Sequence, residues 1–237
     1  MIRKILSRKS ILIAASIVSM AVLFTACKKN KDDVPQTGVA GVMAFNLATD
    51  QPVVSIGLSG NLLGGAPLNY GSFTGTYLNV FPGNRQVSAY GASNNLLDSL
   101  TYSFEQGKYY SVFVVGNNNN YKNVVVQDNY DSLTASSGKA YVRYINAIAG
   151  SGSSNVSVKS GATNVFNGSA TFGQVSPFIA VAPGSLTVDV SNENSANRTI
   201  SVAGQKAYTI LLMGQPNQTD SSKAIQIRFI ENGTVTD

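Results

Sequence analysis

The chain has 237 residues, of which 17 are Lys or Arg and 12 are Asp or Glu, and it contains no His and one Cys. The absence of His excludes a Ser-His-Asp triad and a His-ligated zinc site, and a lone Cys leaves no internal disulfide. Four of the 17 basic residues and none of the acidic ones lie within residues 1–26, so the other 13 basic residues nearly balance the 12 acids. We therefore expect no basic face that would bind nucleic acid.

Residues 1–26 have the three parts of a secretory signal peptide. Four basic residues open the chain, an apolar run follows at residues 11–24, and the small residues Thr25 and Ala26 end the segment. The run is shorter than the roughly 18–20 apolar residues that a membrane-spanning helix needs. We expect a cleaved signal peptide, and the alternative is a retained membrane span.

The residues around the single cysteine resemble the bacterial lipobox, where a signal peptidase cuts just before a cysteine that carries diacylglycerol. The stretch is Leu23-Phe24-Thr25-Ala26-Cys27, and it departs from the usual pattern because Phe24 stands where Leu is common. The resemblance implies that Cys27 is lipidated, and two or more lipid chains anchor a soluble domain stably. The alternative is a free thiol in an ordinary exported protein.

Residues 28–33 form a short charged tether that follows this cysteine. Lys28 directly after the cysteine resembles lipoproteins that are sent on to the outer membrane. The Lys-Asp-Asp ending of the tether resembles the surface-export signal of Bacteroidota lipoproteins. Both resemblances imply an outer-membrane protein that is held by its N-terminal lipid and faces the cell surface.

From Val39 onward, apolar and polar residues alternate with a period of two, which is typical of β-strands. The first half of this region also matches the second half in order, at offsets of 98 to 102 residues. We expect a lipidated cysteine and tether at residues 27–38, a first unit at 39–131, a linker at 132–138 and a second unit at 139–237. The matched stretches include Val42–Ala48 with Val142–Ile148, Tyr70-Gly71 with Phe172-Gly173, Pro82-Gly83 with Pro183-Gly184, and Lys108–Gly116 with Lys206–Gly214.

Each unit has several short alternating stretches separated by Gly, Pro and Asn turns, which predicts a β-sandwich. The expected fold is therefore all-β, with two tandem immunoglobulin-like or transthyretin-like β-sandwich domains after the signal peptide. Residues 54, 56, 110, 112 and 114 should point inward. The strands are expected near residues 39–47, 53–58, 73–81, 85–91, 97–104, 108–116 and 122–128, and then near 139–148, 154–160, 174–182, 185–191, 197–202, 206–213 and 223–231.

The repeated pattern resembles the domain-of-unknown-function family 4397. The second unit carries Val142-Arg143-Tyr144-Ile145-Asn146-Ala147, a Pro-Gly turn before a strand, and a Lys-x-Tyr-Thr stretch that runs into aliphatic residues and ends at Gly214. The first unit has the corresponding stretches but Met43 in place of the arginine. The resemblance implies a lipoprotein built of β-sandwich repeats, and it implies no activity.

The best candidate for a binding edge is an amide-rich turn in the first unit, made by Asn118, Asn119, Asn120 and Tyr121. Asparagine amides can hydrogen-bond a partner and a tyrosine ring can stack on a sugar. The alternative is a solvated hairpin loop, because Asn and Gly are good turn residues for ordinary reasons. Eight of the 11 tyrosines lie in this unit, and exposure of several around Tyr121 would favour sugar binding.

Two serines stand in short stretches that resemble the Bacteroidota O-glycosylation sequon, Ser99 in Asp98-Ser99-Leu100 and Ser132 in Asp131-Ser132-Leu133. No spacing of acids predicts a calcium loop or glycosidase geometry, so we expect no metal, no cofactor and no catalytic residue. Asn46 and Asn146 end the first strand of each unit and are expected to bond turn backbone groups.

These features predict a non-enzymatic outer-membrane lipoprotein whose two sandwiches present an interaction surface to a glycan, an envelope protein or another cell. The alternative is a carbohydrate-binding lipoprotein of a polysaccharide-uptake system. A third possibility is an enzyme that uses carboxylates or a metal, and this would require at least two acids to converge in one cleft. Dispersal of Asp98, Glu105, Asp128 and Asp131 would remove that possibility.

Overall fold

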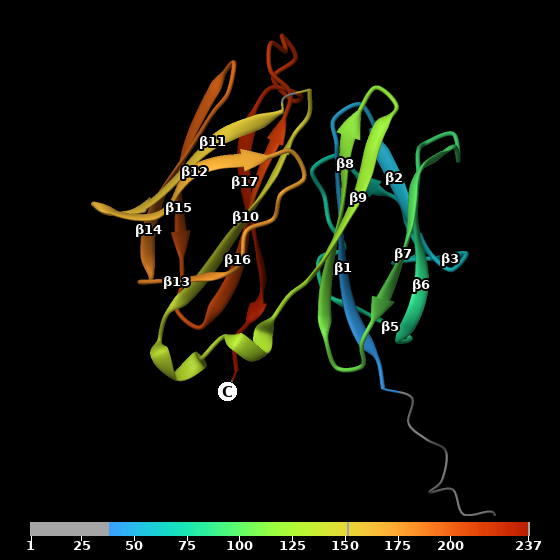
Figure 1. Ribbon diagram of the computed structural model, residues 1–237, viewed down its shortest axis with the longest axis horizontal. Coiled ribbons are helices and arrows are strands. Elements are labelled where there is room, and N and C mark those ends of the chain that lie inside the picture. Colours follow the sequence, from blue (N-terminus) through green and yellow to red (C-terminus); the bar gives the residue numbers. More distant parts are fainter. Residues whose placement is uncertain (1–37, 151, 237) are drawn as a thin grey trace, which may run out of the picture. The chain divides into compact units, whose positions relative to one another are not determined.

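The computed structural model describes residues 38–150 and 152–236. In the first repeat, one sheet has the strand order β5-β1-β8-β9 and the other has the order β3-β2-β6-β7, with β4 also paired to β2 (Figure 1). The strands are β1 (Ala40–Ala48), β2 (Val53–Leu58), β3 (Asn61–Leu62), β4 (Leu68–Asn69), β5 (Leu78–Val80), β6 (Gly83–Tyr90), β7 (Leu96–Phe104), β8 (Tyr109–Asn117) and β9 (Asn120–Gln127).

The second repeat has the same arrangement, with sheets β13-β10-β16-β17 and β12-β11-β14-β15. In both repeats the first strand runs parallel to the penultimate one, β1 with β8 and β10 with β16. The prediction of two tandem β-sandwiches is confirmed. These strands are β10 (Ala140–Ile148), β11 (Ser153–Ser160), β12 (Thr163–Thr171), β13 (Ile179–Val181), β14 (Gly184–Ser191), β15 (Ser195–Val202), β16 (Lys206–Gly214) and β17 (Gln226–Thr234).

The parallel pairing gives each sandwich a base, where its first and penultimate strands begin, and a tip, where both finish. In the first sandwich Gly41 lies opposite Tyr109 at the base, and Ala48 lies opposite Gly116 at the tip. The described chain therefore begins at the base of the first sandwich, at Gly38.

In strands that have only one face in a sandwich core, the apolar residues of the alternating pattern are buried and the polar residues between them are more exposed. Val54 and Ile56 in β2 are buried while Ser55 between them is half-buried, and Val156 and Val158 flank Ser157 in the same way. Tyr110, Val112 and Val114 also face the first core, as the period of two predicts.

One long strand, β12, was not predicted. Its sequence holds two Asn, a Gly and a Ser, which are poor strand formers, and most of its side chains are exposed. It forms because it pairs antiparallel with β11 along eight positions, while Val165 and Phe166 pack against the core. In the first repeat the equivalent edge of β2 is covered only by the two-residue strands β3 and β4.

The strands expected at residues 73–81 and 174–182 are shorter than predicted. Only Leu78–Val80 and Ile179–Val181 form ladders, and each upstream part makes a single bridge to the first strand, Phe45 with Phe73 and Ile145 with Val175.

The central strands β1, β8, β10 and β16 are buried on both faces over almost their whole length. One face of each strand lies in its own sandwich core. The other face lies in a third apolar cluster that joins the two repeats, and Phe45 stacks there on Phe113 with ring centroids 4.6 Å apart. Its buried members are Met43, Phe45, Leu47, Phe113, Val115, Val124, Ile145, Ala147, Leu211 and Met213.

Equivalent residues of the two repeats meet reciprocally across this cluster, so the two sandwiches pack like the halves of an isologous dimer. Gly71 lies against Arg228 of the second repeat, and its counterpart Gly173 lies against Val124 of the first. Val124 and Arg228 are themselves equivalent, because they pair with Phe113 and Leu211. At the tip, Asn117 donates from Nδ2 to Gln215 Oε1 at 2.8 Å, and these two residues each follow the last glycine of the matched strand.

Between β9 and β10 the chain forms two 3-10 turns, Tyr130–Ser132 and Ala135–Ser137, and part of it packs against the second sandwich. Leu133 and Ala135 are buried in a small cluster with Tyr141. The Tyr141 hydroxyl donates to the carbonyl oxygen of Thr134 and accepts from its N–H, both at 2.9 Å.

No helix within residues 38–150 or 152–236 is long and apolar enough to cross a membrane. The expected signal peptide at residues 1–26, the lipidation site Cys27 and the tether through residue 37 lie outside the described residues.

Candidate functional site

The predicted amide-rich turn lies at the tip of the first sandwich, where it joins β8 to β9. Asn118 and Asn119 occupy the two central positions with φ values of +50° and +63°. Asparagine tolerates this left-handed conformation better than most residues, and a pair of such positions matches the twist of the flanking strands. The sequence therefore places asparagines here for a backbone reason, whatever else they do.

Tyr121 is held in place beside this turn rather than presented as a free ring. Its hydroxyl donates to the Asp50 carboxylate at 2.9 Å and accepts from Gln51 Nε2 at 2.6 Å. The ring is half-buried and packs against the first core. Asp50 also accepts the backbone N–H of Asn118 at 2.7 Å, so one carboxylate fixes both the turn and the tyrosine.

The side chains of Asn118, Asn119 and Asn120 are exposed, and none of their amides has a hydrogen-bond partner within the described part of the chain. Asn46 and Asn146 differ sharply from them, because both are fully buried. The Asn146 amide donates to the Ala170 carbonyl at 2.9 Å and accepts from the N–H of Ile148 at 3.2 Å. The buried pair thus braces the fold, while the three turn amides remain available.

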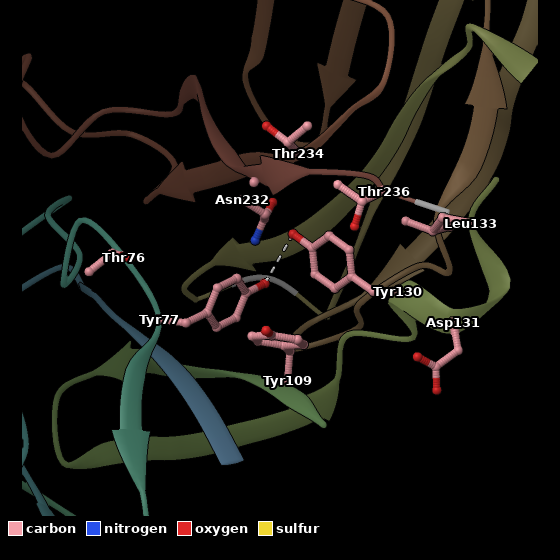
Figure 2. A pocket seen from close by; sticks show the side chains of 10 residues that line it. Thr76, Tyr77, Tyr109, Tyr130, Asp131, Leu133, Asn232, Thr234 and Thr236 are labelled. Carbon is pink, nitrogen blue, oxygen red and sulfur yellow. Dashed lines mark hydrogen bonds between the residues drawn. The ribbon is translucent and has the colours of Figure 1, made fainter. Parts of the chain in front are cut away.

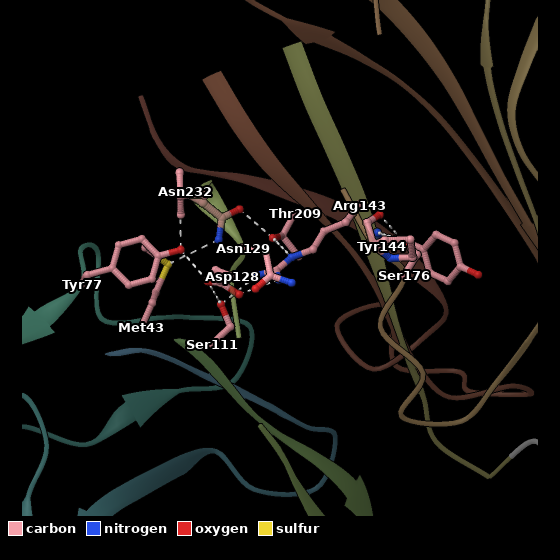
Figure 3. A network of polar contacts seen from close by, with 12 residues as sticks. Met43, Tyr77, Ser111, Asp128, Asn129, Arg143, Tyr144, Ser176, Thr209 and Asn232 are labelled. Atoms are coloured by element: carbon pink, nitrogen blue, oxygen red, sulfur yellow. Dashed lines mark hydrogen bonds and ion pairs between the residues drawn. The ribbon is translucent and has the colours of Figure 1, made fainter. Parts of the chain in front are cut away.

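At the opposite end, near the base, a buried ion pair joins the two repeats. Arg143 donates from Nη1 to Asp128 Oδ1 at 2.6 Å, and both side chains are almost completely shielded from solvent (Figure 3). The other two guanidinium nitrogens also form hydrogen bonds. Nε donates to Thr209 Oγ1 at 2.9 Å, and Nη2 donates to Ser111 Oγ at 2.8 Å. The guanidinium carbon lies 4.4 Å from the ring centroid of Phe178.

The network is asymmetric although it uses equivalent positions of the two repeats. In the first repeat Ser111 lies opposite Val126, and Asp128 follows two residues later. In the second repeat Thr209 lies opposite Ile230, and Asn232 follows two residues later. Asp128 and Asn232 therefore occupy equivalent positions. Arg143 stands where the first repeat has Met43, whose sulfur lies 3.9 Å from Asn232 Nδ2.

Reasoning from sequence missed this pairing. Its one visible signal was the presence of Arg143 in the matched strand of one repeat and its absence from the other.

A groove of about 680 Å³ lies beside this network, between the base of the first sandwich and the last strand of the second. Three tyrosines line it edge to face, with Tyr77 and Tyr109 centroids 4.9 Å apart and Tyr109 and Tyr130 centroids 5.5 Å apart (Figure 2). Tyr109 is 43% exposed, and it is the only exposed large aromatic residue of the groove. The other wall carries Asn232, Gly233, Thr234 and Thr236.

The inner tyrosines of the groove stay protonated. Burial raises the pKa of Tyr130 to about 12, and burial together with the neighbouring Asp128 carboxylate raises the pKa of Tyr77. The Tyr77 hydroxyl donates to Asp128 Oδ2 at 2.5 Å and therefore belongs to the ion-pair network. This leaves Tyr109 as the aromatic face that a ligand can reach.

Three of the four acidic side chains considered for catalysis make structural contacts, and the fourth, Glu105, is exposed. Asp98 accepts the N–H of Asn123 at 2.6 Å and so ties β7 to β9. Asp128 is enclosed by Arg143, Asp131 pairs with Lys108 at the surface, and Glu105 is exposed in the turn before β8. Among the described residues, no group of three or more His, Cys, Asp or Glu side chains is placed to hold a metal ion.

The two candidate glycosylation serines differ in accessibility. Ser132 is exposed in the first 3-10 turn, where its hydroxyl donates to the Asn129 carbonyl at 2.7 Å. Ser99 is half-buried in β7 and shares a 3.0 Å hydrogen bond with Ser88. Modification remains a prediction for both residues, and Ser132 is the more accessible acceptor.

The family model described as Domain of unknown function (DUF4397) matches residues 40–156 and 140–236, which together cover both sandwiches. The chain belongs to the DUF4397 family. The two matched regions follow the structural duplication, because the first contains β1 to β9 and the second contains β10 to β17. No curated protein matches the sequence.

Two solved structures align loosely with this DUF4397 chain. One is a "putative cell adhesion protein" from Bacteroides ovatus ATCC 8483, with 10% identity, a TM-score of 0.26, and coverage of 85% of this chain and 99% of that one. The other has the same description and comes from Bacteroides eggerthii DSM 20697, with 10% identity, a TM-score of 0.21, and coverage of 84% and 96%. Likenesses this loose carry no functional description over to the DUF4397 chain.

Proposed function

We propose that this protein is a non-enzymatic lipoprotein of the outer membrane that faces the cell surface and binds a partner at the tip of its sandwiches. The observation that carries the proposal is the row of three free amides at Asn118, Asn119 and Asn120. Each amide offers two donors and one acceptor on a turn whose backbone is already fixed by Asp50. Presenting hydrogen-bonding groups on a rigid turn limits the entropy lost on binding.

The anchor in this proposal rests on the lipobox-like stretch that ends in Cys27, and the surface orientation rests on the Lys-Asp-Asp tether. The tip lies at the end of the first sandwich opposite to the point where the described chain begins. A protein held from its N-terminus would therefore present the tip away from the membrane. The absence of catalysis is part of the proposal, and the structural contacts of Asp98, Asp128 and Asp131 support it.

A second candidate function is carbohydrate binding for a polysaccharide-uptake system, and the groove beside Tyr109 favours it. An exposed tyrosine face with threonine and asparagine side chains opposite offers stacking and hydrogen bonds to a sugar ring. The same function at the amide-rich turn is not favoured, because the Tyr121 ring packs on the core.

One experiment separates these candidates. The chain from residue 34 onward is captured on outer-membrane extracts and on a panel of immobilised oligosaccharides. Asn118→Gly with Asn119→Gly removes two amides and keeps the turn, because glycine adopts positive φ at no steric cost. Loss of two hydrogen bonds should weaken tip binding by about tenfold or more. Asn94→Gly, another positive-φ asparagine, is the matched control.

Retention that falls with the double glycine variant and is unchanged by Asn94→Gly supports the tip. Oligosaccharide binding that is lost with Tyr109→Ala and kept by the glycine variant supports the groove instead. If all variants retain the same partners as the parent chain, or the parent retains none, both candidate sites are wrong.

A further inference from the structure

The exposed large apolar residues of the described chain all lie in the first repeat, and most of them gather near its base. Phe81 is 63% exposed, Leu62 48%, Tyr109 43% and Val39 39%. A fifth, Leu96, is 58% exposed but pairs with Tyr90 at the tip. Several exposed apolar side chains that lie near one another on a small domain indicate a contact surface.

Val39 and Phe81 are neighbours at the point where the chain enters the first sandwich. Ala40 pairs with Val80 across the antiparallel strands β1 and β5. This places Val39, which precedes Ala40, beside Phe81, which follows Val80, at the base. Phe81 also forms one wall of an apolar groove of about 420 Å³, together with Leu58, Leu62, Leu63 and Val80. The groove therefore runs from Phe81 at the base along the open flank between β5 and β3. Leu62 lies further from the base, because it pairs with Gly57, which in turn pairs with Ser88 in β6.

A cation lies at the edge of this apolar surface. Arg85 lines the groove and donates from Nε to the carbonyl oxygen of Phe81 at 3.1 Å and from Nη2 to that of Pro82 at 3.3 Å. No carboxylate pairs with it among the ion pairs of the described residues. An apolar surface bordered by an unpaired guanidinium matches the boundary between the acyl chains and anionic headgroups of a bilayer.

The second repeat lacks this surface although it has the same fold. Lys139 precedes β10 where Val39 precedes β1, and Ala182 follows β13 where Phe81 follows β5. Tyr109 is matched by Ala207, which is fully buried. The fold therefore does not require exposed apolar residues at these positions, and they occur only in the repeat that the N-terminal segment enters.

The length of chain between Cys27 and the first sandwich limits how far the base can lie from the bilayer. Ten residues lie between Cys27 and Gly38, and the eleven Cα-to-Cα steps span at most roughly 40 Å when the chain is fully extended. A lipid on Cys27 would hold the start of the first sandwich within that distance of the bilayer, so the bilayer is always within reach of the base.

We propose that Val39, Leu62 and Phe81, with Arg85 at their border, form a lipid-contact surface that lays the base of the first sandwich on the membrane. The proposal rests on the anchored function above, and it adds an orientation, with the base on the bilayer and the tip turned outward. Contact by these side chains would supplement the lipid anchor, since each buried apolar group adds to membrane affinity in proportion to its area.

The chain contains no Trp, so a single introduced indole reports on one position. Phe81→Trp places it on the proposed surface, and Leu96→Trp places it at the tip on an equally exposed residue. Residues 28–237 with an N-terminal hexahistidine tag are bound to chelating lipids in phosphatidylethanolamine–phosphatidylglycerol vesicles. This tag holds the protein where the lipid would, so the test does not depend on whether Cys27 is lipidated.

The expected result is a blue-shifted emission from position 81 that brominated lipids quench several-fold more strongly than the emission from position 96. Val39→Lys with Leu62→Ser in the F81W chain should abolish that quenching, because it brings the base closer to the composition of the second repeat. Equal, weak quenching at both positions on protein-covered vesicles would overturn the proposal. A blue shift at position 81 that appears without vesicles and grows with protein concentration would also overturn it, in favour of a second copy of the chain.

Partner capture is read through the variants at positions 118 and 119, and lipid contact is read through quenching of the indole at position 81. Failure of one experiment and failure of the other are therefore distinct results.

Discussion

Replacing Asp128 by asparagine is expected to lower the free energy of unfolding by about 3–5 kcal/mol. The change leaves the Arg143 guanidinium buried against Phe178 without its carboxylate, and an uncompensated buried charge is far more costly than a lost surface contact. Chemical denaturation of the chain from residue 34 onward measures the difference. Asp131→Asn is the matched control, because Asp131 is exposed and its surface pair with Lys108 should contribute little to stability.

The two repeats supply the residues for a stricter version of this test. Arg143→Met introduces the residue that the first repeat carries at this position, and Asp128→Asn introduces the one that the second repeat carries. Each single change leaves one buried charge without its partner, whereas the double variant removes both charges. We expect the double variant to be more stable than either single variant. Additive losses would show that the ion pair does not couple the two sandwiches.

Alanine at Gly116 or Gly214 is expected to cost more than about 4 kcal/mol, which is exceptional for a single substitution. A Cβ atom at Gly116 would lie 2.1 Å from the carbonyl oxygen of Asn120, and one at Gly214 would lie 2.2 Å from that of Ala224. Both contacts are with backbone, which cannot move aside as a flexible side chain can. Both glycines also have strongly positive φ, at +122° and +109°.

Gly83→Ala provides the control that separates the clash from the backbone conformation. Gly83 has a φ of +102°, yet nothing lies within 4 Å of the position its Cβ would take. Its alanine variant should therefore cost only the conformational strain of about 1–3 kcal/mol. Thermal or chemical unfolding of the three variants gives the comparison. Equal losses at positions 83, 116 and 214 would contradict the steric explanation.

The sandwich fold could be predicted from the sequence because a strand with one buried and one solvent-facing side has alternating apolar and polar residues. Val54, Ser55 and Ile56 show this pattern, and so do their counterparts in the second repeat. The contact between the sandwiches was not predicted, because the alternation at residues 110, 112 and 114 accounts for only one face of β8. Phe113 and Val115 lie on the other face, in the cluster that joins the two repeats. An unbroken apolar run in a strand indicates burial on both faces, and that signal was present in β8 and β16.

The candidate site was predictable only in part, for a related reason. Composition located the amide-rich turn, because Asn and Gly mark turns in any context. It could not show that Asp50 holds Tyr121, since the two residues are 71 positions apart in sequence. The groove beside Tyr109 is built from both repeats, and no local pattern reveals which residues two packed sandwiches bring together.

Cysteine labelling on intact cells tests whether the tip faces outward while the base lies on lipid. Cys27 is the only native cysteine, so Asn120→Cys or Phe81→Cys in the full chain adds a single further thiol. We expect a membrane-impermeant maleimide to modify position 120 on intact cells and to reach position 81 only after detergent is added. Equal modification of both positions on intact cells would contradict the lipid contact, and no modification of either before lysis would contradict the surface orientation.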